Sequence, residues 1–275
     1  MSSLVVNTNL SALSAYNGLN ATDQAMTKAI QELSSGLAIQ TAADGPAAYV
    51  TSQALLSQAN GYQAAISNAQ DGVSLIQTAS GALNQISSIL QTMNQLALSS
   101  ANGATQDQTS LTANQQEFQA LQSEINQIAA TTSYGSRNLL DGTFANTLQV
   151  GAFNLSNQQI AISITNSDAS SLGLGTTIGV GSVASAQAAI TAVQSAIASV
   201  DTIEATVGAT QNELQAIAAN LTVGQQNLTA AQSQLVDVNM AQEMTQYSTD
   251  QILMQTGTAM LGQAQQAPQL VLKLI

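Results

Sequence analysis

An apolar residue recurs every seven positions through the C-terminal half of the chain, and this spacing limits the fold more than any other feature. The repeat consists of Val193, Val200, Val207, Leu214, Leu221, Leu228 and Leu235. Residues seven apart lie on one face of an α-helix, so the stripe must be covered by other helices along its length. No proline occurs from residue 182 to 240, and a helix over that range would extend about 90 Å at roughly 1.5 Å per residue. The stripe therefore predicts a long helix in a coiled-coil-like rod.

Other segments repeat the same spacing. The stripes are Leu19, Met26, Leu33 with Leu37; Ile76, Leu83, Leu90; and Leu111, Phe118, Ile125. The turn signal Asn102-Gly103 separates the last two stripes, so residues 60–130 are expected to form two antiparallel helices with a short connection. The first stripe is expected to run until Asp44-Gly45-Pro46 interrupts it.

Residues 140–180 have a different pattern. Apolar and polar residues alternate at Leu148 and Val150 and again at Ile160, Ile162 and Ile164. This alternation predicts a small β-hairpin that turns at residues 154–157, and glycines at 173–181 predict a loop back to helix. The expected fold is thus mainly α: long antiparallel helices in a rod, with a small β-hairpin.

Composition excludes several classes of function. The chain has no Cys and no His, which excludes disulfides, thiolate or imidazole metal sites and His-dependent triads. Lys28, Arg137 and Lys273 are the only basic residues against 15 acidic ones, and the net charge is −12. Nucleic-acid and anionic-membrane binding are therefore not expected. The start of the chain lacks the pattern of a secretory signal peptide, and no apolar run approaches the roughly 18 residues of a membrane span.

The remaining carboxylates offer no catalytic pattern. Asp44, Asp71 and Asp141 each precede a glycine, which is typical of turns and helix ends rather than of metal loops. Glu117 and Glu124 share a helical face that is expected to be solvated. We therefore predict no enzyme, no metal site and no cofactor. Arg137, the only guanidinium, is expected to seek an acidic partner within the chain or on a neighbour.

Several local motifs together resemble the two ends of bacterial flagellin. The N-terminal ones are Leu33-Ser34-Ser35-Gly36-Leu37, Ala42-Ala43-Asp44-Gly45-Pro46-Ala47, residues 68–79 and Asn138-Leu139-Leu140-Asp141-Gly142. The C-terminal ones are residues 251–261 and 264–272. They occur in the order that the family has, at both ends of the chain.

The resemblance implies a subunit that polymerises into the bacterial flagellar filament, the helical propeller for swimming. In this family the terminal helices, here residues 1–45 and 236–275, form an inner tube, and residues 46–235 would form the surrounding helical rod. The gap between the two matched halves is too short for outer domains, which implies a short form. The resemblance also implies an extracellular location, reached through the flagellar type III apparatus without a cleaved signal.

The partners implied are other copies of the chain, sibling flagellins, an export chaperone, and the filament cap and hook-junction proteins. Subunit packing is expected to involve Leu19, Met26, Leu33, Leu37, Leu83, Leu90, Phe118, Ile125, Leu214, Leu221, Leu228, Leu235, Ile252, Leu253 and Leu261. Leu96 and Glu124 match the pattern that an innate immune receptor contacts in flagellins, whereas Thr92 does not. A hook–filament junction protein and a secreted coiled-coil adhesin remain as alternatives.

The scarcity of charge predicts how the polymer responds to salt. Contacts built from Ala, Leu, Gln, Asn and Thr should depend little on ionic strength, because screening acts only on charges. Light scattering of filaments at neutral pH should therefore be nearly the same at low and high salt. A steep salt dependence would show instead that ion pairs govern the contacts.

Overall fold

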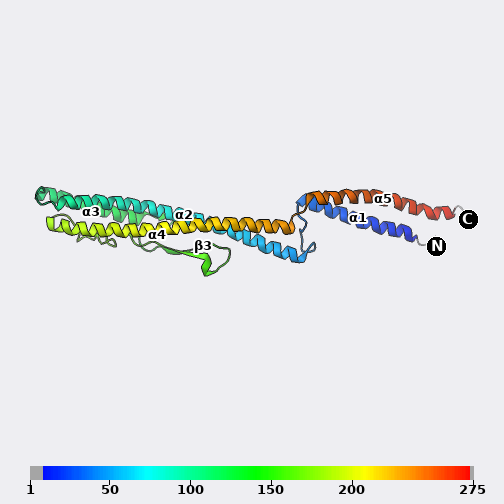
Figure 1. Cartoon of the computed structure of the whole chain (residues 1–275), viewed down its shortest axis with the longest axis horizontal. Coiled ribbons are helices and arrows are strands. Elements are labelled where there is room, and N and C mark those ends of the chain that lie inside the picture. Colours follow the sequence, from blue (N-terminus) through cyan, green and yellow to red (C-terminus); the bar gives the residue numbers. More distant parts are fainter. Residues whose placement is uncertain (1–8, 273–275) are drawn as a thin grey trace. The chain divides into compact units, whose positions relative to one another are not determined.

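A computed structural model describes residues 9–272, and side chains to residue 266. Five long helices dominate these residues: α1 (Leu10–Ser35), α2 (Pro46–Ser100), α3 (Gln108–Thr131), α4 (Val183–Val236) and α5 (Met240–Leu272) (Figure 1). Two compact units are present, one built from the described residues up to 57 and from 227 onward, the other from residues 58–226. We call them the terminal unit and the rod unit. The predicted mainly α fold is confirmed.

The core of the rod unit is a set of apolar seams between α2, α3 and α4, which run beside one another (Figure 1). The predicted stripe of α4 supplies Val193, Val200, Val207 and Leu214, which are at most 3% exposed. The facing positions from α2 and α3 are Ile76, Leu83, Leu90, Phe118 and Ile125, all at most 1% exposed. Each helix thus buries the heptad face that the sequence indicates, and α2 and α3 are antiparallel, as predicted.

The hydropathy of α4 differs from the sequence expectation. One 18-residue window of this helix has a mean hydropathy of 1.3, which meets a length and composition criterion for crossing a membrane, with 28% of the window buried. The helix contains no long uninterrupted apolar run, because Ser, Thr and Gln break each run. Its seam residues Val193 and Val200 are fully buried against neighbouring helices.

The first helix ends earlier than predicted. It stops at Ser35, because Gly36 adopts a left-handed conformation with φ of +76° and donates its N–H to the Glu32 carbonyl at 2.8 Å. The predicted interruption at Asp44–Pro46 instead marks the start of α2, where Pro46 occupies the first turn, which needs no N–H. Leu37 therefore lies outside the helix, in an isolated bridge with Asp237.

The predicted hairpin is confirmed as β3 (Ala145–Gln149) and β4 (Gln159–Ser163), which pair antiparallel. The short helix η1 (Ser156–Gln158) lies in its loop. Two glycines of α2 allow the hairpin to approach: a Cβ on Gly61 would lie 2.6 Å from the Cβ of Ala152, and one on Gly72 would lie 2.6 Å from Leu148 Cδ2. Between them, Asn68 Nδ2 donates to the Gln149 carbonyl at 3.0 Å.

The segment that returns from β4 to α4 is held by side-chain amides of α3. Gln122 Nε2 donates to the carbonyls of Leu174 and Ile178 at 3.1 and 3.2 Å. Gln115 Oε1 accepts from Val180 N at 2.5 Å, and Asn126 Oδ1 accepts from Ala169 N at 2.9 Å. These bonds satisfy backbone groups that a packed loop would otherwise leave unpaired. The sequence patterns did not indicate this role.

The close approach at Gly72 leads to a prediction for stability. Gly72→Ala should destabilise the rod unit by about 1–3 kcal/mol, because the new methyl must displace Leu148 and Leu214, whose Cδ1 lies 3.1 Å from its position. Gly81→Ala is the matched control, since nothing lies within 4 Å of a Cβ there. In the same helix it should stabilise by about 0.5–1 kcal/mol. Denaturant unfolding measures both; equal effects would contradict the packing.

Candidate assembly surface

Helices α1 and α5 pack side by side along the terminal unit (Figure 1). Shielded positions of α1 recur at Leu19, Met26 and Leu33, and those of α5 at Met254 and Leu261. A Cβ on Gly257 would lie 3.2 Å from Leu19 Cδ1, and Asn9 Nδ2 donates to the Ala264 carbonyl at 2.7 Å. These two contacts join the start of α1 to the later part of α5, so the helices are antiparallel.

The seam between these helices is thin. Among the described residues of the two helices only Ala29 and Asp250 are buried, at 2% and 4% exposure. Asp250 Oδ1 accepts from Gln246 Nε2 at 3.1 Å, and its Oδ2 has no hydrogen-bond partner. A carboxylate in such a position weakens rather than strengthens the seam, because its desolvation is not fully compensated.

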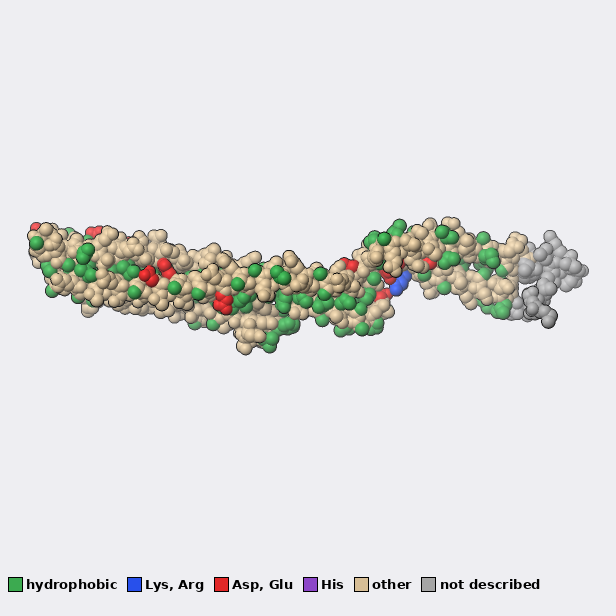
Figure 2. Space-filling view, viewed as in Figure 1, with side chains coloured by type: hydrophobic (Ala, Val, Ile, Leu, Met, Phe, Trp, Pro, Cys, Tyr) green, Lys and Arg blue, Asp and Glu red, His purple; other side chains and the backbone are tan. Residues whose placement is uncertain are grey.

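The outer faces of the same helices expose many apolar side chains. They are Leu10, Leu13, Tyr16 and Ile30 on α1, and Met240, Met244, Ile252, Leu253 and Met260 on α5, all between 47% and 74% exposed. Figure 2 shows apolar side chains, in green, scattered among the other side chains and the backbone along this pair. Ile252 and Leu253, which the sequence assigned to subunit packing, are in this set. These nine large apolar side chains make the helix pair a candidate surface for contact with another protein.

A small charged cluster joins the C-terminal part of α1 to the loop that follows it. Lys28 Nζ lies 3.4 Å from Glu32 Oε1 and 4.0 Å from Asp44 Oδ1. The Thr41 backbone N–H, followed by the Thr41 hydroxyl, lowers the pKa of Asp44, and Lys28 adds to this effect. Because the side chain of Lys28 is 57% exposed, its ion pairs contribute little to stability.

The other residues assigned to packing lie in three settings. Leu83, Leu90, Phe118, Ile125 and Leu214 are fully buried inside the rod unit, and Leu221 packs with Ala65 and Ile66 in a smaller cluster. Their contacts are therefore made within one chain. Leu37 and Leu228 are half-buried, and Leu235 is 36% exposed. Of the receptor-pattern residues, Leu96 packs against the core and Glu124 is exposed on α3.

The aspartates that precede glycines behave in two ways. Asp141 caps a turn, accepting from the backbone N–H and the hydroxyl of Thr143 at 2.9 and 2.7 Å, and Asp44 does the same with Thr41. Asp71 does not, because α2 continues through Asp71-Gly72. The turn interpretation was wrong there, since Gly72 serves the packing of Leu148. In residues 9–272 no three His, Cys, Asp or Glu side chains gather as a metal site would require.

Both ends of the chain match known family regions. Residues 6–145 match the bacterial flagellin N-terminal helical region, and residues 190–275 match the bacterial flagellin C-terminal helical region. The chain belongs to the bacterial flagellin family. It is similar to a flagellin of Halalkalibacterium halodurans, with 38% identity over 278 residues that cover 99% of this chain and 100% of the relative. It is 40% identical to polar flagellin F of Vibrio parahaemolyticus over 62% of this chain and 45% of that relative.

Solved structures agree with this assignment. The crystal structure of Bacillus cereus flagellin matches with a TM-score of 0.50 and 30% identity, over 60% of this chain and 94% of that one. A putative flagellar hook-associated protein from Vibrio parahaemolyticus matches with a TM-score of 0.60 over 70% of this chain and 100% of that one. At 14% identity the second match shows a shared fold alone.

The family defines the class of protein. Flagellins are structural subunits of the flagellar filament, and this chain is a subunit of that kind. Residues 146–189, between the two matched regions, contain most of the hairpin and the return loop, which makes this a short flagellin. The junction-protein and adhesin alternatives are not favoured, because both matched regions are those of flagellin itself.

The capping carboxylates of the rod unit predict a pH dependence. The hydroxyl and backbone N–H of Ser110 lower the pKa of Asp107, the N-cap of α3, whose Oδ1 accepts from Ser110 N at 2.7 Å. The pKa of Asp107 is lower in the folded chain than in the unfolded chain. Its carboxylate therefore contributes fully to the free energy of unfolding above the unfolded pKa, about 3.9, and this contribution is lost as the pH falls through the folded pKa.

The midpoint temperature of thermal unfolding should therefore fall less between pH 5 and pH 3 for Asp107→Asn than for the wild-type chain. Asparagine keeps the cap without the titration, so the difference between the two unfolding midpoints should become smaller as the pH falls. Parallel pH profiles would contradict the assignment.

Proposed function

We propose that the chain polymerises into the flagellar filament through the exposed faces of α1 and α5, and that residues 1–45 and 236–275 form its inner tube while residues 46–235 form the rod around it. The observation that carries this proposal is the row of exposed apolar side chains on both terminal helices, including Ile252 and Met260 at 60% and 64% exposure. Copies of the chain would cover these faces for one another.

The thin seam explains why assembly and folding would be coupled. The α1–α5 pair buries little of its own apolar surface and encloses Asp250 with an unpaired oxygen. Isolated helices are marginal in water without tertiary packing. Each exposed side chain of the size of Ile252 would stabilise the polymer by about 1.5–3 kcal/mol when a neighbouring copy covers it. We propose that the pair is largely unfolded in the monomer and becomes stable in the polymer.

The proposed mechanism is mechanical rather than chemical. The rod unit has long helices locked by buried heptad positions such as Leu83, Phe118 and Leu214, and close-packed interiors of this kind resist compression and transmit strain. A polymer of such rods would carry torque from a rotating base and act as a propeller. We infer no catalytic activity for the chain.

The remaining partners follow from the same surface. An export chaperone would bind α5, because Met244, Ile252 and Met260 would otherwise drive premature association. Filament cap and hook-junction proteins would contact the ends of the polymer, where these faces have no copy beside them. We propose that the chain reaches the cell exterior through the flagellar export apparatus without a cleaved signal.

A substitution at Ile252 tests the assembly face, because this exposed side chain is not part of the packing within one chain. Ile252→Asn should raise the critical concentration for polymerisation roughly tenfold or more, because it removes apolar area that only a neighbouring copy covers. Thr249→Asn, at an exposed polar position of the same helix, is the control and should polymerise normally. A chain ending at residue 239 should form no filaments. Sedimentation of the polymer measures all three, and normal assembly of the truncated chain would refute the inner-tube assignment.

A further inference from the structure

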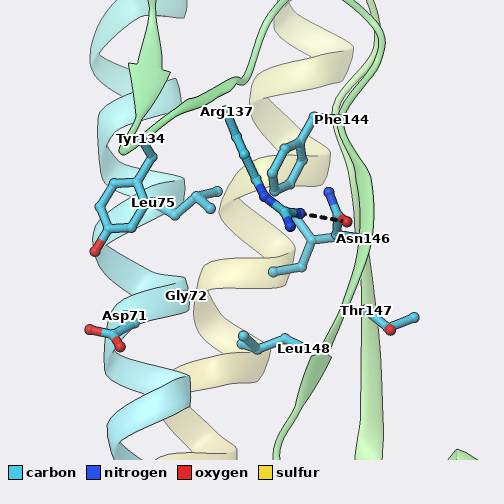
Figure 3. A pocket seen from close by; sticks show the side chains of 10 residues that line it. Asp71, Gly72, Leu75, Tyr134, Arg137, Phe144, Asn146, Thr147 and Leu148 are labelled. Carbon is cyan, nitrogen blue, oxygen red and sulfur yellow. Dashed lines mark hydrogen bonds between the residues drawn. The ribbon is translucent and has the colours of Figure 1, made fainter.

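A cavity of about 210 Å³ opens on the rod unit between α2, the first small hairpin and β3 (Figure 3). Its lining is Asp71, Gly72, Leu75, Tyr134, Arg137, Phe144, Asn146, Thr147, Leu148 and Ile162. The walls are mostly apolar: Phe144 and Ile162 are buried, and Leu75 and Leu148 are half-buried. The cavity is large enough for one side chain and too small for a helix.

A tight turn places Arg137 at this cavity. Strands β1 (Ser133–Tyr134) and β2 (Arg137–Asn138) pair so that Tyr134 lies opposite Arg137. Gly135 has φ of +63°, and no residue other than glycine has a positive φ among those described. A glycine at the first central position followed by an ordinary residue is the pattern of a type II′ turn. The turn therefore holds the side chains of Tyr134 and Arg137 together at the cavity.

The guanidinium of Arg137 is oriented but not neutralised. Its Nη1 donates to Asn146 Oδ1 at 2.8 Å, and Figure 3 shows the group lying beside Phe144. The carboxylate of Asp71 points away from it in the same view. Within the described residues the ion pairs are those of Lys28, so the guanidinium forms no ion pair with any carboxylate among them. Several of its N–H groups remain for another acceptor.

We propose that this cavity receives a carboxylate side chain from a second copy of the chain, so that Arg137 forms an ion pair across a subunit contact. The inference rests on the proposed polymerisation. Charge complementarity identifies the occupant, because a chain with net charge −12 presents many carboxylates to any neighbour and very few cations. A guanidinium can bind a carboxylate with two parallel hydrogen bonds. The apolar walls would contact the methylene groups of the incoming side chain and shelter the pair from solvent. Salt screens a sheltered pair little, so this contact agrees with the weak salt dependence expected for the polymer.

The exposed carboxylates of the rod unit are the candidate donors. Glu117 and Glu124 lie on α3, and Asp201 and Glu213 lie on α4, all exposed and none in an ion pair within the described residues. Asp71 on α2 is exposed as well, but it lines the cavity itself and is therefore not counted among the four donors. Asp107, Asp141 and Asp168 are already engaged by turn and cap hydrogen bonds. One of the four exposed carboxylates is therefore expected to enter the cavity of a neighbouring copy.

Loss of the guanidinium provides the first test. Arg137→Gln should leave the unfolding midpoint of the monomer unchanged and raise the critical concentration for polymerisation on the order of tenfold, the loss expected for one charge-assisted hydrogen bond. Ser136→Gln is the matched control, because it introduces the same side chain at the exposed neighbouring position of the same turn, and it should polymerise normally. An equal effect of both variants, or normal polymerisation of Arg137→Gln, would overturn the cavity contact while leaving the filament function intact.

Charge reversal provides the second test. Arg137→Glu should block polymerisation, and combining it with the correct one of Glu117→Arg, Glu124→Arg, Asp201→Arg or Glu213→Arg should restore it. Restoration by one pair identifies the donor. Restoration by none, in double variants with the wild-type monomer unfolding midpoint, would overturn the proposal. If the wild-type chain itself does not polymerise under conditions where other flagellins do, the proposed function fails and this contact fails with it.

Discussion

The structure depends on burial along narrow seams rather than in a thick core. Val193, Leu83 and Phe118 are each fully buried, yet each belongs to a single file of side chains between helices. A seam of this kind gains stability in proportion to its length, since the hydrophobic effect follows the apolar area removed from water. Long helices are therefore a requirement of the design, and every connection between them must leave the heptad faces in register.

The sequence predicted the parts of the fold that obey a simple period. The stripe of α4 and the alternation at Ile160 and Ile162 are local patterns, and a helix or a strand has few ways to bury them. Parts that depend on competition between signals were predicted less well. Both Gly36 and Pro46 can end a helix, and only the conformation shows that Gly36 ends α1 while Pro46 begins α2.

Contacts between distant segments were not predictable from the chain alone. Gly72 was interpreted as part of a turn, but it lies inside a helix. A glycine is needed at this position because Leu148, from a strand far along the sequence, occupies the space beside it. Gln115 and Gln122 have no sequence signal that separates them from the many solvent-exposed glutamines. For the assembly surface, periodicity identified the shielded positions such as Leu19 but not the outward ones such as Leu10 and Met260, whose role depends on what covers them.

The base of the β3–β4 hairpin is packed against the rest of the rod unit, whereas its tip is exposed. Its base is fixed by the paired strands and by the contact of Ala152 with Gly61, whereas Asn154 and Leu155 at its tip are exposed. Exposed loop tips tolerate insertions, because little backbone there is buried. A foreign peptide or a whole domain joined between Asn154 and Leu155 would leave the helical seams unchanged. The same scaffold could thus display many copies of an inserted sequence along one polymer.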